Sequence, residues 1–316
     1  MTDMRVAVTG GAGYIGSKLV KNLLDECYDV VALDNQSTGN YNYLRHLKTA
    51  KLEIIEGDIR NPLDLDKVLK GADVVVHAAA LSDLDACNEN PEEAVSVNVY
   101  GTHRVLEAII RNGVRRVVFC SSAAIYGSPK KIPVTERHPL QPLNLYGITK
   151  LTGEKLIESY QLNKGVETVN LRFGNVYGVG LYTNWIGVIP KFVSLGVKGK
   201  PLTVYGDGNS TRDFVHIEDI TRAITLSLVA KGIKRETLNI GSETTTVNEI
   251  AGIVAREVEK VKRKKVSITH LPPRQGETKE FSYDTSRIKS VLGFEPKWKL
   301  EEGIKQIVRY RIDSEK

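Results

Sequence analysis

The chain has 316 residues, which on a prior of about 150 residues per domain predicts about two domains. Hydrophobic residues make up 41% and charged residues 26% of the chain, an ordinary globular composition that excludes disordered, collagen-like and disulfide-dependent proteins. Lysine and arginine total 44 against 38 acidic residues, so the net charge of +6 favours an anionic partner: a nucleic acid, a membrane surface or a small molecule.

Five short runs rich in β-branched residues alternate with helical patterns in the first half of the chain. The runs span 5–9, 29–34, 52–55, 73–77 and 116–120, and helices are predicted at 15–25, 64–70 and 91–112. The runs are almost continuously apolar, as expected for parallel strands that are covered on both faces. This alternation predicts an α/β fold with a doubly wound, Rossmann-type parallel sheet.

The pattern changes after about residue 175, where loops rich in Gly, Tyr and Asn appear. Single helices are predicted beyond them at 218–229 and 247–259. We therefore expect a first domain at 1–173, to which 214–245 returns. A smaller α/β domain that binds substrate is expected at 174–213 and 246–316, with the active site between the two.

The cysteines and the apolar stretches exclude several kinds of protein. Cys27, Cys87 and Cys120 are odd in number and widely spaced, which fits neither a disulfide framework nor a CxxC metal site. Each is predicted to be a small buried residue in a reducing, cytoplasmic setting. We expect no signal peptide, no membrane segment and no metal. The basic run 260–265 is predicted to be a solvated helix end rather than a nucleic-acid patch.

A glycine-rich turn follows the first predicted strand and opens the first helix. Gly10, Gly13 and Gly16 have the spacing G-x-x-G-x-x-G. Glycine permits the tight turn and lets a pyrophosphate approach the backbone at the helix N-terminus. Asp34 ends the second strand, 18 residues after Gly16, where a carboxylate accepts both ribose hydroxyls of NAD and repels the 2′-phosphate of NADP. The sequence therefore predicts an NAD site.

Further residues are expected around this cofactor. Asp58 follows the third strand and is expected to reach the adenine amino group. The small residues Ala78, Ala79 and Ala80 end the fourth strand and leave room for the cofactor against the backbone. His77, just before them, is predicted to be hydrogen-bonded within the strand end and not to be a ligand.

Tyr146 and Lys150 are spaced to share one face of a predicted helix. A free tyrosine has a pKa of about 10, too high for a base at neutral pH. The lysine and a positive nicotinamide ring are expected to lower that pKa substantially. Ser122 follows the fifth strand at the carboxyl edge of the sheet, where it is expected to share a hydrogen bond with Tyr146 and a substrate hydroxyl.

Together these motifs resemble the extended branch of the short-chain dehydrogenase/reductase superfamily, the NAD-dependent epimerase/dehydratase family. The resemblance covers almost the whole chain. Its markers are 9–16, 33–35, 98–102, 121–127, Tyr146 with Lys150, 171–178, 187–190, 205–208, 211–216 and 274–277.

The resemblance implies a full set of cofactor-binding residues. They are Gly10, Gly13, Tyr14, Ile15, Gly16, Asp34, Asn35, Asp58, Ile59, Ala78, Ala79, Ala80, Asn98, Tyr146 and Lys150. The catalytic residues that it implies are Ser122, Tyr146 and Lys150.

It also implies a substrate site for a nucleotide sugar, a UDP-sugar. Asn175, Arg212 and Arg274 match residues on the diphosphate side, where arginine forks suit phosphate oxygens. Tyr205 matches an aromatic residue beside uracil and Glu277 an acid on the ribose. The substrate-binding residues expected are Ser122, Tyr146, Asn175, Val188, Tyr205, Arg212, Arg274, Glu277 and Phe281.

The reaction is indicated by what is absent after Ser122. Dehydratase and decarboxylase relatives carry an acid at one or both of the next two positions, whereas this chain has Ala123 and Ala124. Neither alanine moves a proton, so only a cycle that removes hydride and returns it remains. The chain is therefore most similar to UDP-glucose 4-epimerases, isomerases of galactose metabolism. Phe281 matches the position that gates the C2 substituent of the sugar, and its bulk resembles that of enzymes limited to glucose and galactose.

Alternative functions stay open at this point. They are a UDP-N-acetylglucosamine or UDP-uronic acid 4-epimerase, a decarboxylase or dehydratase that uses an acid elsewhere, and a non-catalytic NAD-sensing or nucleic-acid-binding module. The intact set of Ser122, Tyr146 and Lys150 disfavours the last, because a binding module does not need all three. The resemblance also implies a homodimer formed through the helices at 91–112 and 146–163.

Overall fold

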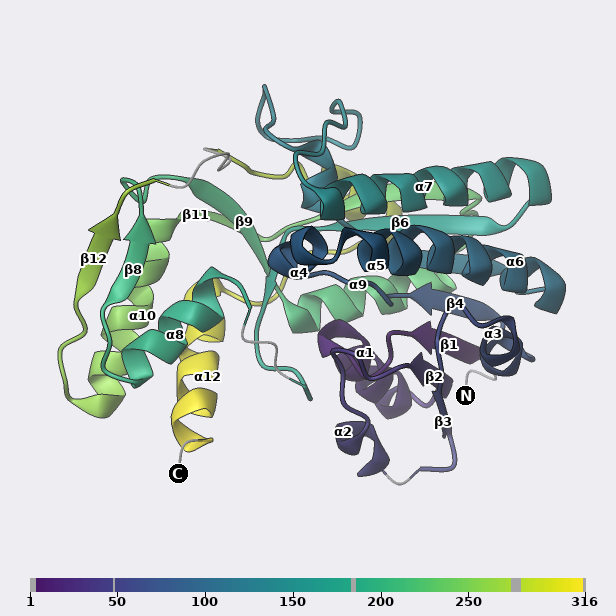
Figure 1. The fold of residues 1–316 in the computed structure, drawn as a ribbon, viewed down its shortest axis with the longest axis horizontal. Coiled ribbons are helices and arrows are strands. Elements are labelled where there is room, and N and C mark those ends of the chain that lie inside the picture. The colour runs from purple at the N-terminus through teal and green to yellow at the C-terminus, as the bar shows by residue number, and fades with distance from the viewer. Residues whose placement is uncertain (1–3, 48, 183–185, 274–279, 315–316) are drawn as a thin grey trace.

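The computed structural model describes residues 4–47, 49–182, 186–273 and 280–314. Its centre is a parallel seven-stranded sheet with the strand order β3-β2-β1-β4-β5-β6-β10, which confirms the predicted doubly wound sheet (Figure 1). The strands are β1 (Arg5–Thr9), β2 (Asp29–Asp34), β3 (Leu52–Glu56), β4 (Val74–His77), β5 (Arg116–Ser122), β6 (Glu167–Phe173) and β10 (Arg235–Ile240).

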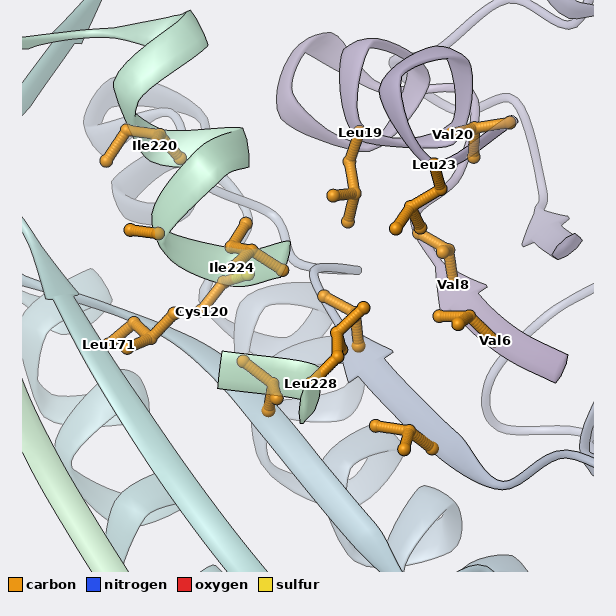
Figure 2. Close-up of a cluster of buried hydrophobic side chains, with 14 of the residues drawn as sticks. Val6, Val8, Leu19, Val20, Leu23, Cys120, Leu171, Ile220, Ile224 and Leu228 are labelled. Carbon is orange, nitrogen blue, oxygen red and sulfur yellow. The ribbon is translucent and has the colours of Figure 1, made fainter. Parts of the chain in front are cut away.

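Helices cover both faces of this sheet, because its side chains are apolar on both faces. On one face α1 (Tyr14–Asp25) and α9 (Ile217–Val229) pack against the sheet in a single cluster, as Figure 2 shows. On the other face lie α3 (Pro62–Leu69), α6 (Thr102–Asn112) and α7 (Leu145–Lys164). The shorter helices are α2 (Asn42–Arg45), α4 (Leu84–Glu89) and α5 (Pro91–Val95).

The helix predicted at 91–112 is interrupted. Between α5 and α6, residues Ser96–Gly101 form a π-helical turn. Such turns occur mostly inside α-helices and often at functional sites. Here the wider turn carries Asn98, which is buried.

A second group of elements lies beside the large sheet. It contains β7 (Asn175–Tyr177), β9 (Thr211–His216) and β11 (Glu243–Thr246) in one sheet, and β8 (Leu202–Tyr205) with β12 (Ile268–Leu271) in another. The helices α8 (Val188–Val197), α10 (Val247–Lys262) and α12 (Leu300–Asp313) share one apolar cluster with residues of these strands. Figure 1 shows these elements gathered at the end of the large sheet toward which β9 and β11 extend.

The division into two domains at the expected boundaries stays a prediction. β10, within the segment expected to return, completes the large sheet. Residues Ile288 and Phe294, in and just after α11 (Ser286–Leu292), pack in the cluster under α1 and α9, although the expected division assigns them to the smaller domain.

Two of the three cysteines lie where the sequence predicts. Cys87 and Cys120 are buried and free, whereas Cys27 is exposed, so the prediction of a buried residue was wrong there. Cys27 follows the end of α1 with a φ of 67°, and its amide donates to the carbonyl oxygen of Leu24 at 3.0 Å. This left-handed position turns the chain back after the helix, which places the side chain in solvent.

Among the described residues, no helix combines the length and the apolar character needed to cross a membrane.

Replacing Cys27 with Gly should stabilise the protein. Left-handed backbone costs an ordinary residue roughly 1 kcal/mol that glycine does not lose. We expect the free energy of unfolding to rise by about 0.5–1 kcal/mol, measured by urea denaturation. The control is Cys27→Ala, which also removes the thiol but keeps the strain. An equal gain in both variants would show that the thiol, and not the backbone, is responsible.

Candidate active site

The site begins where β1 and β4 lie side by side, the point at which the strand order reverses. Ligands of doubly wound sheets bind at the carboxyl ends of the strands at this point. Gly10 follows β1 with a φ of 72°, and a Cβ there would lie 2.6 Å from the amide nitrogen of Ala79. The amide of Ala78 donates to the carbonyl oxygen of Thr9 at 3.1 Å. The glycine loop and the alanine segment are therefore in backbone contact, and no side chain fits between them.

The loop leads into an open helix N-terminus. A Cβ on Gly16 would lie 1.9 Å from the carbonyl oxygen of Gly10, so this glycine permits the tight turn. Gly13 is the N-cap of α1 and provides no side-chain cap, and a Cβ there would meet only the oxygen of Gly10, at 3.4 Å. Uncapped amides at a helix N-terminus suit a phosphate group. The residues present therefore fit the pyrophosphate of a dinucleotide.

Asp34 reaches this loop from the end of β2. Its carboxylate accepts hydrogen bonds from the amides of Ala12, at 3.0 Å, and Gln36, at 2.7 Å. Burial raises the pKa of Asp34 above its usual value, and the backbone amides of Gln36, Ala12 and Gly13 oppose this rise. A carboxylate beside the glycine loop is the arrangement expected for a ribose contact.

Asn35 and Asp58 meet at the ends of β2 and β3. The Asn35 amide donates to Asp58 Oδ2 at 3.0 Å, while Arg60 donates to Oδ1 at 2.9 Å and to Oδ2 at 2.6 Å. These hydrogen bonds hold the pKa of Asp58 below its usual value.

Ile59 is buried among the apolar residues under α3 and α6, and a Cβ on Gly101 would lie 2.5 Å from its Cδ1. Only the backbone of Ile59 is thus left for the predicted cofactor contact.

The side chains of Tyr14 and Ile15 also point away from the glycine loop. The Tyr14 hydroxyl donates to the carbonyl oxygen of Gly178 at 2.7 Å, which fastens the start of α1 to the segment after β7. Ile15 packs against the core under α1. Their backbone amides, at the open end of α1, are what the predicted cofactor contacts would use.

The predicted catalytic residues come together at the start of α7. The helix is capped by Asn144, whose side chain accepts from the amide of Gly147 at 2.8 Å. The Lys150 Nζ lies 5.9 Å from the centre of the Tyr146 ring and 4.7 Å from the centre of the Phe119 ring. Ser122, at the end of β5, interacts through its hydroxyl with the Tyr146 phenol.

Burial controls the ionisation of this pair. Desolvation raises the pKa of Tyr146 above 10, and the hydrogen bond with Ser122 opposes the rise. Desolvation also lowers the pKa of Lys150 to about 8. In the protein alone the desolvation of the phenol outweighs the effect of Ser122. The lowering of this pKa by Lys150 together with a nicotinamide ring stays a prediction.

Asn98 is engaged by the protein itself. Its Oδ1 accepts from the amide of Leu81 at 2.8 Å, and its Nδ2 donates to the Leu81 carbonyl oxygen at 2.9 Å and to Thr149 Oγ1 at 3.0 Å. Asn98 therefore ties the segment after β4 to α7 beside Lys150, which makes it a positioning residue. The sequence reasoning that expected a cofactor contact missed Thr149.

His77 is hydrogen-bonded within the fold, as predicted. Its two ring nitrogens lie 2.8 Å from Thr9 Oγ1 and 3.0 Å from Thr102 Oγ1. Burial lowers the pKa of His77 to about 3, so the ring is neutral at pH 7. Within the described ranges, no three His, Cys, Asp or Glu side chains gather as metal ligands.

A cleft of about 260 Å³ lies next to the start of α1, which follows the glycine loop. It is lined by Tyr14, Ser82, Asp83, Gly174–Tyr177, Ile186–Pro190 and Phe214, which includes the predicted residues Asn175 and Val188. The Asn175 amide donates to the carbonyl oxygen of Asp213 at 3.1 Å. A larger hollow of about 380 Å³ lies between α1 and α9 beside Trp298. None of the predicted site residues lines it, so the smaller cleft is the better candidate for the substrate site.

The remaining substrate residues are spread over several elements. Phe281 is buried against Tyr126 and Tyr283, and its amide donates to Thr211 Oγ1 at 3.0 Å. Its ring thus lies beside the turn that follows Ser122. Tyr205 ends β8, and Arg212 lies in β9, where its guanidinium donates to the carbonyl oxygen of Thr211 at 2.8 Å. The other two predicted residues, Arg274 and Glu277, lie outside the described residues.

Sequence reasoning also missed Glu154, a buried carboxylate on α7. The available signal was its spacing of four residues from Lys150, which places it one turn further along the same helix face.

Comparison with known proteins gives these features a context. The model of the NAD dependent epimerase/dehydratase family matches residues 6–241. A Methanocaldococcus jannaschii protein, named provisionally as a UDP-glucose 4-epimerase, is 38% identical over 310 residues, covering 96% of this chain and 97% of the relative. The UDP-glucose 4-epimerase of Mycolicibacterium smegmatis is 33% identical over 316 residues, covering 97% and 98%.

Solved structures agree with the fold along the chain. The UDP-N-acetylglucosamine 4-epimerase from Methanobrevibacter ruminantium, in complex with UDP-N-acetylmuramic acid, has a TM-score of 0.90 at 30% identity and covers 99% of this chain and 100% of its own. The dTDP-glucose 4,6-dehydratase DesIV from Streptomyces venezuelae, with NAD and TYD bound, has a TM-score of 0.90 at 32% identity and covers 98% and 97%. These matches confirm the predicted fold and NAD as the cofactor, while the sugars and reactions of the relatives differ.

Replacing Lys150 with Met should stabilise the folded protein most at neutral pH. Because the folded pKa is about 8 and an unfolded lysine has a pKa of about 10.4, the ammonium destabilises the fold at low pH, and this penalty is relieved as the pH rises from about 8 to about 10.4. The Tm gain of the variant should therefore be larger at about pH 7 than at about pH 10, measured by scanning calorimetry.

The matched control is Lys155→Met, on the same helix. The Lys155 side chain is 65% exposed and paired with Glu158, so its removal should give no such gain. A Tm change in Lys150→Met that does not depend on pH would contradict a buried ammonium at this position.

Proposed function

This chain belongs to the NAD dependent epimerase/dehydratase family, and from that premise we propose that it interconverts UDP-galactose and UDP-glucose by inverting C4 of the sugar. The observation that carries the proposal is the turn that directly follows Ser122, beside Tyr146. The next two residues, Ala123 and Ala124, form the turn that Ser122 caps. They have no group that moves a proton, so neither of the two positions after Ser122 supplies a second acid or base.

The proposed mechanism assigns each residue a separate task. The NAD supplies a hydride acceptor that later returns the hydride, so the net reaction needs no external oxidant. The Tyr146 oxygen takes the proton of the C4 hydroxyl, and Ser122 holds that hydroxyl through a hydrogen bond. The ammonium of Lys150 stabilises the phenolate. After the 4-keto sugar turns over beside Tyr146, this residue returns the proton to the other epimer.

Burial explains why this tyrosine needs charged neighbours. Desolvation raises the pKa of Tyr146, so its phenolate forms only where positive charge offsets that cost. With its pKa lowered to about 8, Lys150 is still mostly protonated at neutral pH and supplies one such charge. A bound NAD would supply the other through its positively charged nicotinamide ring.

The proposed substrate contacts account for part of the positive net charge. Asn175, Val188, Arg212 and Arg274 are proposed to hold the diphosphate, and Tyr205 and Glu277 the nucleoside. An uncapped helix N-terminus supports this assignment, because α8 begins at the cleft after Gly187 without a side-chain cap. A UDP-sugar is supported by the relatives named as UDP-glucose 4-epimerases.

A second candidate reaction rests on Asp83. Its carboxyl group belongs to a residue that lines the cleft, and it is the kind of acid that a dehydratase or decarboxylase needs. Against this, Asp83 caps α4 by accepting from the amide of Ala86 at 2.8 Å. We therefore favour the 4-epimerase.

We also propose that the protein is a homodimer that forms through α5, α6 and α7. Exposed apolar residues on these helices and the turn between them support the proposal: Val95, Tyr100, Ile110, Ile148 and Leu162. A cytoplasmic location stays a prediction.

The purified protein should interconvert UDP-galactose and UDP-glucose without added NADH, followed by product NMR. Tyr146→Phe should lower kcat by about 10²–10⁴-fold, because only the phenol moves the proton, while it still binds the UDP-sugar.

The matched control is Tyr160→Phe, further along the same helix, whose hydroxyl bonds to Glu107. It should keep nearly all of the activity. Free 4-keto or dehydrated product would instead point to the reaction through Asp83, and turnover of dTDP-, GDP- or ADP-sugars alone would contradict the proposed nucleotide.

Phe281→Ser should widen the substrate range toward N-acetylated sugars. The smaller side chain opens space beside Tyr126 and Tyr283, where the buried phenylalanine now packs. We expect the ratio of kcat/KM for UDP-N-acetylglucosamine over that for UDP-glucose to rise at least about tenfold. If the unaltered protein already prefers the N-acetylated sugar, Phe281 is not the gate.

A further inference from the structure

Glu154 is a buried carboxylate that binds two neighbouring strands. It lies one turn beyond Lys150 on α7 and is 5% exposed. Its Oε1 accepts from Ser121 Oγ at 2.5 Å and from Arg172 Nε at 2.9 Å, and its Oε2 accepts from Arg172 Nη2 at 2.7 Å. Ser121 and Arg172 are paired in the β5–β6 ladder. One carboxylate therefore joins α7 to the carboxyl ends of both strands.

Arg172 extends this connection to the far side of Ser122. Its Nη1 donates to the Tyr126 hydroxyl at 2.6 Å and to the carbonyl oxygen of Glu136 at 3.1 Å. Tyr126 ends the short 3₁₀ turn (Ala123–Tyr126) that Ser122 caps. Ser121 before Ser122 and Tyr126 after it are thus both held by the Glu154–Arg172 pair.

The same helix face packs closely on β5. A Cβ on Gly153 would lie 2.8 Å from Phe119 Cζ, so α7 approaches the strand as closely as its side chains allow. The Phe119 ring lies 4.7 Å from Lys150 Nζ. Figure 1 shows α7 running along β6 on this side of the sheet. A displacement at Glu154 would therefore move Lys150 against Phe119.

Glu154 is also the acid that acts on the Lys150 ammonium. The other titratable groups that face Lys150 are Tyr146 on its own helix, Cys120 on β5, Cys87 on α4 and His77 on β4. The pKa of His77 is lowered and those of Cys120 and Cys87 are raised by burial, so at neutral pH these three are uncharged.

We propose that Glu154 is a positioning residue: its carboxylate sets the Tyr146–Lys150 face of α7 against Ser122. This rests on the proposed function for the identity of the reaction. Physical chemistry supports a role beyond stability, because a well-packed apolar pair often replaces a buried ion pair without loss of stability. The buried pair of Glu154 and Arg172 is therefore better explained by the elements that it holds together than by its contribution to stability.

The first test measures turnover. Glu154→Gln should lower kcat for UDP-galactose at least about tenfold, with KM changed less than about threefold, since the diphosphate contacts lie elsewhere. The double variant Glu154→Leu with Arg172→Met removes both charges, so its Tm should return toward wild type while kcat stays low. Recovery of kcat in the double variant would overturn the positioning role, because Glu154 would then only neutralise Arg172.

The control is Arg116→Met, at the opposite end of β5. Arg116 is 2% exposed and donates to the carbonyl oxygens of Ser227, Leu228 and Ala230 at the end of α9. Its loss should lower Tm and leave kcat per folded molecule unchanged. An equal fall of kcat in this variant would show that general destabilisation explains the effect.

The second test needs no substrate. The Tm gain from Lys150→Met is measured across pH in the wild-type and Glu154→Gln backgrounds. Without the Glu154 charge the pKa of Lys150 falls further, so the pH at which this gain begins to decline should move to a lower value. An unmoved profile would show that Glu154 does not act on Lys150 and would overturn the positioning role. If no UDP-sugar is turned over, the proposed function fails, while this measurement still decides whether Glu154 acts on Lys150.

Discussion

The contact between the glycine loop and the alanine segment is the constraint on which the rest of the site depends. β1 and β4 pair in parallel, with Thr9 opposite His77, so the segments that leave them meet at once. A Cβ on Gly10 would lie 2.6 Å from the Ala79 nitrogen, so the two backbones touch without a side chain between them. Strand pairing alone therefore fixes the relative positions of the glycine loop, the start of α1 and the segment at 78–83, without the help of a bound ligand.

Around this contact, polar groups are buried in pairs that join different elements. His77 bonds to residues of β1 and α6, and Asn98 bonds to the segment after β4 and to α7. Burying such groups is costly unless each finds a partner, so each pair constrains two elements at once. The same lack of water raises the pKa of Tyr146 and lowers that of Lys150. The rigidity and the altered acidity of the site therefore have one cause, which is desolvation.

Sequence reasoning succeeded where the position of a residue follows from local chain geometry. The strand–turn–helix around Gly10, the carboxylate of Asp34 at the end of β2 and the helical spacing of Tyr146 and Lys150 each depend on a few neighbouring residues. It could not identify the hydrogen-bond partners that distant elements provide. Asn98 is taken up by Leu81 and Thr149, which no spacing within its own helix could reveal.

The sequence by itself determined the doubly wound sheet, the glycine loop and the set of residues that reach its carboxyl edge. These are set by periodicity, by glycine at positions that exclude a side chain, and by strand direction. Only the tertiary structure decided that the chain at 91–112 contains a π-helical turn, that Cys27 faces solvent, and that Glu154 joins two strands to α7. These features depend on which residues far apart in the chain share a buried space, and that is settled by packing and desolvation rather than by local pattern.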